Sequence, residues 1–129
     1  LARYRVMDLF LDTYPYNAGT TASDALWMGL PVLTLSGNSF PSRMAAGLLR
    51  AINLPELITS NKSEYEAKAI ELGINSKKIN SIKNNLANNI DSTPLFNSGK
   101  FTKNLESIYS KMFERLVNRL EPDDIYSEN

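Results

Sequence analysis

The stretch MDLFLDTYPYNAGTTASDALWMGLPVLTL, residues 7–35, decides the fold class. It begins and ends with short apolar runs, residues 7–11 and 31–35, each of which stops at polar or turn-forming residues. Short apolar runs with such boundaries are typical of buried parallel strands. We therefore expect two neighbouring strands at the two ends of this stretch.

The residues between the two runs predict a loop followed by a helix. Pro15 and Gly19 favour a loop, and Thr20 or Thr21 can cap a helix that Gly29 would end. A strand, a loop, a helix and a second strand make a crossover unit of an α/β protein with a doubly wound sheet. In such sheets ligands bind at the carboxyl ends of the strands, so the loop and the start of the helix become the candidate site.

The second half of the chain is predicted to be mainly helical. Leu57 and Ile58 suit a brief third strand, and Ser63 with Glu66 forms a capping box for the helix that follows. Apolar residues at helical spacing predict helices in residues 41–52, 63–73, 79–90 and 101–116.

Bulk composition limits the class of protein and of partner. The 129 residues are 43% hydrophobic and 22% charged, as in one soluble globular domain. Lys plus Arg and Asp plus Glu both number 14, which argues against a nucleic acid or an anionic membrane as partner. No apolar run approaches the roughly 18 to 20 residues of a membrane span, and no signal sequence is visible, so we expect a cytoplasmic protein.

The chain contains neither cysteine nor histidine. Thiolate and imidazole chemistry is therefore excluded within it, and no metal-ligand set is visible. The chain also begins at Leu1 without a methionine and runs at once into a strand-like segment, which suggests a piece of a larger protein.

The start of the first predicted helix is a candidate phosphate site. The first N–H groups of a helix lack internal partners and the helix dipole adds positive potential, so they favour an anion. Gly19 allows the backbone a close approach, Thr20 and Thr21 add hydroxyl donors, and Asp24 one turn later can accept hydrogen bonds from a ribose. Taken singly, these residues fit equally well as a turn, a cap and a dipole-complementing carboxylate, and no P-loop or GxGxxG pattern is present.

A second loop, SGNSFPSR at residues 36–43, follows the second predicted strand. Ser36, Gly37 and Arg43 are candidates for the edge of the same cleft. The alternative is a structural loop in which Arg43 caps carbonyl groups or pairs with an acid. Trp27 and its neighbour Met28 lie in a helical pattern and are expected in the core rather than on a sugar-stacking surface.

The whole series of segments resembles one enzyme family. Residues 8–59, together with EYEAKAIELG (64–73), STPLFN (92–97) and LESIYSKMFERL (105–116), resemble the C-terminal lobe of O-GlcNAc transferases and SPINDLY-like proteins, the GT41-type glycosyltransferases. The resemblance covers nearly the whole chain. It implies the C-terminal Rossmann-like lobe of a GT-B fold, truncated, with a helix-rich second half. Residues 1–120 would form this nucleotide-sugar-binding lobe and residues 121–129 a polar tail.

The resemblance also implies roles for individual residues. Thr20 and Thr21, with Gly19, would hold the donor phosphates, Asp24 would meet the ribose, and Arg3 would lie close to the nucleotide. Gly19 departs from the histidine usual in O-GlcNAc transferases and matches the SPINDLY-like branch. The two branches use UDP-GlcNAc and GDP-fucose respectively, so both donors stay open, with GlcNAc placed ahead of fucose.

The implied activity is an inverting, metal-independent transfer of the sugar to Ser or Thr hydroxyls of proteins. The family's phosphate-contacting lysine, its other lobe and the TPR repeats that present protein substrates would lie upstream. No catalytic residue is assigned within this chain, which we expect to be inactive alone. The alternative is a non-catalytic nucleotide-sensing or protein-interaction module derived from such a lobe.

Overall fold

A computed structural model describes residues 1–127 of the chain. Its sheet has three parallel strands in the order β1-β2-β3. Phe10 of β1 is in register with Val32 of β2, and Thr34 of β2 with Ile58 of β3. The strand bounds are β1 Phe10–Leu11, β2 Val32–Leu35 and β3 Ile58–Thr59.

Within residues 1–127 there are five α-helices, in chain order α1 Thr20–Trp27, α2 Met44–Ala51, α3 Lys62–Ile74, α4 Ser76–Ser92 and α5 Ser98–Val117. Short 3₁₀ helices cover Ala2–Val6, Pro41–Arg43, Pro55–Leu57 and Pro94–Phe96. The prediction of an α/β fold with a helix-rich second half is confirmed. None of the helices in residues 1–127 has both the length and the apolar character of a membrane span.

The first strand is shorter and less buried than the sequence predicted. The prediction covered residues 7–11, but β1 contains only Phe10 and Leu11, and Leu11 is 54% exposed. Among the described residues, β1 is an edge strand paired with β2 alone, so one of its sides has no neighbour. Lys83 of α4 fixes the segment before it, donating to the Met7 carbonyl at 3.2 Å and pairing with Asp8 at 2.7 Å.

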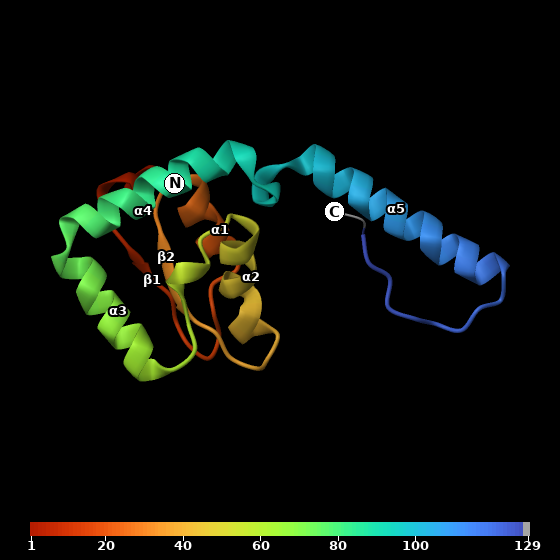
Figure 1. The fold of residues 1–129 in the computed structure, drawn as a ribbon, viewed down its shortest axis with the longest axis horizontal. Helices are drawn as coiled ribbons and strands as arrows, with labels where there is room; N and C mark the ends of the chain where they lie inside the picture. Colours follow the sequence, from red (N-terminus) through yellow and green to blue (C-terminus); the bar gives the residue numbers. More distant parts are fainter. Residues whose placement is uncertain (128–129) are drawn as a thin grey trace. The chain divides into compact units, whose positions relative to one another are not determined.

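Helices cover both faces of the sheet. Helices α1 and α2 pack on β2 from one side and α3 packs on it from the other, as Figure 1 shows. Helix α4 contacts both α1 and α3. The core between these layers consists mainly of aliphatic side chains with at most 1% exposure, including Leu26, Leu30, Val32, Leu33, Leu49, Ile52, Leu54, Leu57 and Leu86.

The cap of α3 differs from the prediction. The N-cap is Asn61, whose side chain accepts the Glu64 N–H at 2.9 Å. The Glu64 carboxylate in turn accepts the N–H and hydroxyl of Ser60 at 2.8 and 2.9 Å. The capping box predicted from Ser63 and Glu66 is therefore wrong by two residues, because the asparagine before the helix takes the capping position.

Trp27 was predicted to be a core residue, and this prediction is wrong. Its side chain is 52% exposed at the last residue of α1. The buried residues of α1 are Ala22, Ala25 and Leu26, a narrow stripe that leaves Trp27 at its edge. Small alanines let α1 lie close to its neighbours, so the larger indole is left at the surface.

The described residues divide into two compact units, Leu1–Leu95 and a second that begins at Phe96. The second contains α5, which has no buried residue, and residues 118–127, which form no helix or strand. The predicted apolar positions of α5 include Phe101, 66% exposed, and Leu116, 73% exposed. Of the predicted tail, residues 128 and 129 lie outside the described part of the chain.

Candidate functional site

The site is built around the loop that leaves the carboxyl end of β1. Asp12 directly follows this strand and is only 6% exposed. Its Oδ1 accepts the N–H of Thr13 at 2.9 Å and the N–H of Ala18 at 2.8 Å. One carboxylate oxygen of Asp12 therefore binds the backbone at both ends of the loop. The second of these ends, Ala18, lies just before α1 begins.

Asn17 connects the same loop to the middle strand. Its side chain is 1% exposed, and its Nδ2 donates to Thr34 Oγ1 at 2.8 Å and to the Leu35 carbonyl at 2.9 Å. The Thr34 hydroxyl donates to Asp12 Oδ2 at 2.6 Å. Sequence reasoning assigned no site role to these residues; the signals were an acid at the end of a strand and a threonine inside an apolar one.

The first turn of α1 carries no side-chain cap. Its N-cap is Gly19, not Thr20 or Thr21 as predicted, because the helix begins at Thr20 itself. The Gly19 carbonyl accepts the Ser23 N–H at 3.0 Å, whereas the N–H groups of the first helical residues have no partner within the helix. Both Thr20 and Thr21 are exposed residues, so this turn lies at the surface of the protein.

Asp24 lies one turn further along α1 and is half-buried. Residues four apart are neighbours on one side of a helix, so Asp24 shares a side of α1 with Thr20. The structure therefore brings a carboxylate and a hydroxyl together on one helix, one turn apart.

A hollow of about 480 Å³ borders the start of α1. It lies between α1 and α2, and its lining residues are Gly19, Thr20, Ser23, Met44, Gly47 and Leu48. Of the predicted phosphate-site residues, Gly19 and Thr20 line this hollow, whereas Thr21 does not. Met44 of α2 had no predicted role in the site. Its side chain contributes an apolar surface to the lining of the hollow.

The loop after β2 lies against the first loop. A Cβ on Gly37 would lie 2.6 Å from Ser42 Oγ and 3.0 Å from Tyr14 Cε2, so only a glycine fits between these side chains. The Gly37 N–H also donates to the Ser42 carbonyl at 3.0 Å. Ser36 and Gly37 therefore sit beside the loop that leads into α1.

Ser36 and Gly37 line a second hollow, of about 390 Å³, at the carboxyl ends of β2 and β3. Arg50 and Glu64 supply its charged groups. Hydrogen bonds donated by Ser60 hold the pKa of Glu64 below its ordinary value. The bond from the Ser60 N–H has the larger effect, and the bond from its hydroxyl is second. Arg43 does not line this hollow; its guanidinium donates to the Asn38 carbonyl, as in the structural-loop alternative.

Tyr65 of α3 reaches the first loop from the other face of the sheet. Its hydroxyl donates to the Asp12 carbonyl at 2.9 Å. Burial, and secondarily the negative charge of Asp12, raises the pKa of Tyr65 above 10.0. Tyr65 thus keeps its proton, and its donor role, through the physiological pH range.

Arg3 is not brought to the start of α1. It lies in the 3₁₀ helix Ala2–Val6, which precedes β1 and is therefore on the amino side of that strand, opposite to the loop at Asp12. Figure 1 shows this segment near the N-terminal label, beside α4. The role of Arg3 stays a prediction.

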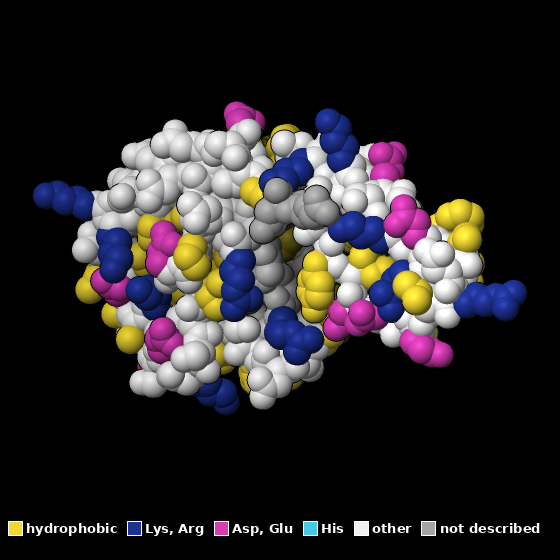
Figure 2. All heavy atoms as spheres, turned by 45° about the vertical axis from the view of Figure 1, so that its right-hand side comes forward, with side chains coloured by type: hydrophobic (Ala, Val, Ile, Leu, Met, Phe, Trp, Pro, Cys, Tyr) yellow, Lys and Arg dark blue, Asp and Glu magenta, His cyan; other side chains and the backbone are white. Residues whose placement is uncertain are grey.

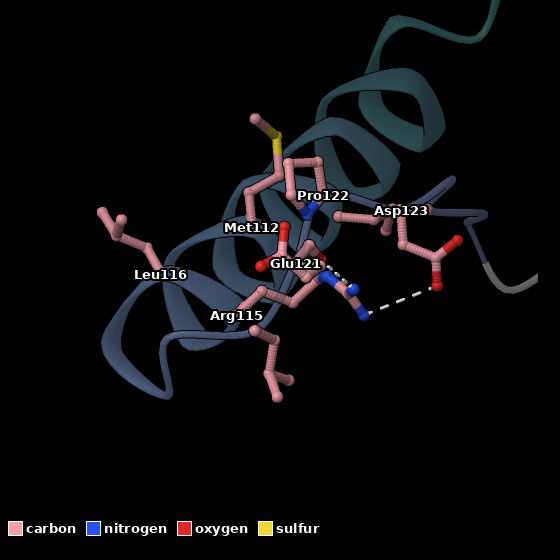
Figure 3. Close-up of a pocket in the computed structure, with 8 residues that line it drawn as sticks. Met112, Arg115, Leu116, Glu121, Pro122 and Asp123 are labelled. Carbon is pink, nitrogen blue, oxygen red and sulfur yellow. Dashed lines mark hydrogen bonds and ion pairs between the residues drawn. The ribbon is translucent and has the colours of Figure 1, made fainter.

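The second unit has a hollow of its own, of about 250 Å³, between α5 and the residues after it. Figure 3 shows Arg115 pointing across it to Asp123, with N and O atoms 3.6 Å apart. Arg115 also donates to the Glu121 carbonyl. None of the predicted site residues lines this hollow.

The surface carries no patch of one sign on the face seen in Figure 2, where cationic and anionic side chains are mixed. Within the described residues, no three or more His, Cys, Asp or Glu side chains form a group able to hold a metal ion.

Comparison with known proteins gives a consistent result. Residues 1–105 match the family described as glycosyl transferase family 41. The probable UDP-N-acetylglucosamine--peptide N-acetylglucosaminyltransferase SPINDLY of Solanum lycopersicum is 35% identical over 112 residues, which are 87% of this chain and 12% of that protein. The corresponding SEC protein of Arabidopsis thaliana is 35% identical over 123 residues, 95% of this chain and 13% of the relative.

A solved structure agrees with these matches. The O-GlcNAc transferase mutant of Thermobaculum terrenum superimposes with a TM-score of 0.81 and 37% sequence identity. The matched region covers 86% of this chain and 21% of that one. The chain thus spans only about an eighth of the curated relatives and a fifth of the solved structure.

Proposed function

Because the chain belongs to glycosyl transferase family 41, we propose that it forms the donor-binding part of a protein O-glycosyltransferase. In this proposal the first turn of α1 holds the diphosphate of a nucleotide sugar. The observation that carries it is an uncapped helix start with two exposed threonines, at the carboxyl ends of parallel strands.

The physical case for a diphosphate rests on three related effects. The unpaired N–H groups of Thr20 and Thr21 are hydrogen-bond donors, their hydroxyls add two more, and the helix dipole contributes about 0.3–1 kcal/mol toward an anion. A hydrogen bond to a charged group is worth about 1.5–3 kcal/mol net. Together these terms favour a doubly charged group over a neutral one at this place.

The remaining predicted residues take supporting roles in the proposal. Asp24, one turn along α1, accepts hydrogen bonds from the ribose hydroxyls. Ser36 and Gly37 form the edge of the cleft, with Arg43 holding the shape of their loop through the Asn38 carbonyl. Arg3 precedes β1 and lies away from the start of α1, so it has no role in the proposed phosphate site.

The proposed reaction moves the sugar from the donor to a Ser or Thr hydroxyl of a protein. We place UDP-N-acetylglucosamine ahead of GDP-fucose as donor, because the relatives are described as N-acetylglucosaminyltransferases. Helix N–H groups stabilise the charge that grows on the departing diphosphate, without a metal ion. Acceptor binding and proton transfer fall to parts of the protein outside this chain, which alone is inactive.

The test is a calorimetric titration of UDP, GDP and their sugars against the whole protein that carries this chain. The Thr20→Ala/Thr21→Ala variant should bind the preferred nucleotide about a hundredfold more weakly, about tenfold for each lost hydroxyl. Thr102→Ala removes an exposed threonine of α5 and should change nothing. If the double variant binds as tightly as the parent, the phosphate assignment is wrong; nucleotide binding without any sugar transfer would favour the sensing module.

A further inference from the structure

Three buried polar side chains connect the loop before α1 to the middle of the sheet. Asp12, Asn17 and Thr34 are 6%, 1% and 0% exposed. Asn17 and Thr34 are 17 residues apart in the sequence, and Asp12 and Thr34 are 22 apart. Each of these two pairs is joined by a side-chain hydrogen bond. We call them the buried polar cluster.

The hydrogen bonds of the cluster run in one direction. Asn17 Nδ2 donates to Thr34 Oγ1 at 2.8 Å, and that hydroxyl donates to Asp12 Oδ2 at 2.6 Å. Only a hydroxyl can accept and donate at the same atom, so Thr34 joins the amide to the carboxylate. Valine has the same shape and would break the connection at this point.

The other carboxylate oxygen of Asp12 reaches the entrance of α1. Asp12 Oδ1 accepts the Ala18 N–H at 2.8 Å, and Ala18 is followed by Gly19, the N-cap. A charge-assisted hydrogen bond of this kind is short and directional. The direction of the peptide planes that open α1 therefore depends on where the cluster holds Asp12.

Filling the core with these polar side chains costs folding free energy. Buried polar groups cost free energy unless all their bonds are made, and Asn17 Oδ1 has no hydrogen-bond partner among the described residues. Apolar side chains of similar volume would fill the same space without that penalty. We infer that the value of the cluster is geometric: it fixes the loop of residues 12–19 between β1 and α1.

We propose that Asp12, Asn17 and Thr34 are positioning residues for the donor diphosphate. The inference rests on the proposed function and extends it by naming what aims the helix start. The three side chains are buried and act through Ala18 and Gly19, so that the N–H groups and hydroxyls of Thr20 and Thr21 converge before the ligand arrives. Preorganised donors of this kind lose no affinity to rearrangement on binding.

The test compares two buried threonines on neighbouring strands. Thr34→Val removes the hydroxyl that joins the cluster, whereas Thr59→Val removes a hydroxyl that donates to the Thr34 carbonyl at 2.9 Å and belongs to no such cluster. Both side chains are at most 1% exposed, but Thr34→Val breaks two buried hydrogen bonds and Thr59→Val breaks one. The free energy of unfolding of each variant is therefore measured beside its nucleotide binding. Thr34→Ser restores the hydroxyl and serves as the conservative rescue.

In the whole protein, Thr34→Val should raise the dissociation constant of the nucleotide about tenfold, as expected for one misaligned charge-assisted bond. Thr59→Val and Thr34→Ser should stay within about twofold of the parent. Equal effects of Thr34→Val and Thr59→Val would overturn the proposal, since they would show a loss of stability and no positioning.

Amide hydrogen exchange in the 129-residue chain separates this outcome from a failure of the proposed function. Thr34→Val should speed exchange at Ala18 and Gly19 relative to Thr59→Val, whether or not nucleotide is present. If Thr20→Ala/Thr21→Ala binds like the parent, the diphosphate site is wrong, and faster exchange in Thr34→Val still supports the cluster as the device that holds this turn. If exchange at Ala18 and Gly19 is unchanged in Thr34→Val, the cluster does not hold this turn either.

Discussion

The methyl group of Met44 occupies the space that a side chain on residue 19 would need. A Cβ built on Gly19 would lie 2.6 Å from Met44 Cε. Gly19 is the N-cap of α1 and Met44 is the first residue of α2, so this contact joins the openings of two consecutive helices. The identity of residue 19 is thus tied to that of residue 44.

This contact predicts a coupled pair of substitutions. Gly19→Ala should change the free energy of unfolding by no more than about 0.5 kcal/mol, because its methyl group displaces only the flexible and partly exposed end of the Met44 side chain. Met44→Ala alone should cost less than about 1 kcal/mol, since Met44 is 36% exposed. In the double variant the added methyl has room without any shift of residue 44, so we expect a small coupling energy of about 0.5 kcal/mol from urea unfolding. Additive effects of the two changes would refute the steric conflict.

The hydroxyl of Tyr65 predicts a pH dependence of stability. Its pKa in the folded protein is raised above 10.0, so its contribution is fully present below the unfolded pKa and is lost as pH rises through the folded value. At about pH 8, Tyr65→Phe should cost about 1 kcal/mol through the lost bond to the Asp12 carbonyl. As the pH rises above 10.0, the difference between parent and variant should shrink.

Urea unfolding of both proteins across the alkaline range checks this prediction. Tyr109→Phe is the matched control, because Tyr109 of α5 is 59% exposed, and its difference from the parent should not vary with pH. A constant difference for Tyr65→Phe would mean that its hydroxyl does not hold the loop.

The packing of α4 predicts that a substitution on its buried side destabilises the protein far more than one on its exposed side. Leu86 is fully buried on the side of α4 that also carries the buried Ile79 and Ile82, and α4 contacts α1 and α3. Leu86→Ala should lower the free energy of unfolding by about 2–4 kcal/mol, a large share of the roughly 5–15 kcal/mol typical of a domain. Asn85→Ala, on the exposed side of the same turn, should stay within about 0.5 kcal/mol. Similar losses for both would place Leu86 outside the core.

Local sequence pattern was sufficient where the apolar residues of a single element decide its position. The run of residues 31–35 predicted β2, and the spacing of Ile79, Ile82 and Leu86 predicted the buried side of α4. In α4 the apolar residues repeat with the helical period, and in β2 an unbroken apolar run indicates a strand buried on both faces, so neighbours in sequence report on burial. The resemblance to the transferase family, confirmed by the match over residues 1–105, added the fold.

The same local pattern was insufficient where distant residues decide. The bond between Asn17 and Thr34 joins two elements whose distance in space no spacing along the chain reveals. Leu11 is apolar like its neighbours, yet an edge strand leaves it 54% exposed. Trp27 fits a helical pattern, but the pattern does not set the width of the buried stripe, which in α1 is made of alanines.

The most direct test of the central claim is to follow the backbone amides of the 129-residue chain by NMR while UDP or GDP is added. We expect weak, millimolar binding by this chain alone, equivalent to a binding free energy of about 4 kcal/mol. The account predicts that the largest shifts fall on the amides of Thr20, Thr21 and Ala22, and that Thr20→Ala/Thr21→Ala reduces them. Saturable binding that leaves these three amides unmoved would contradict it.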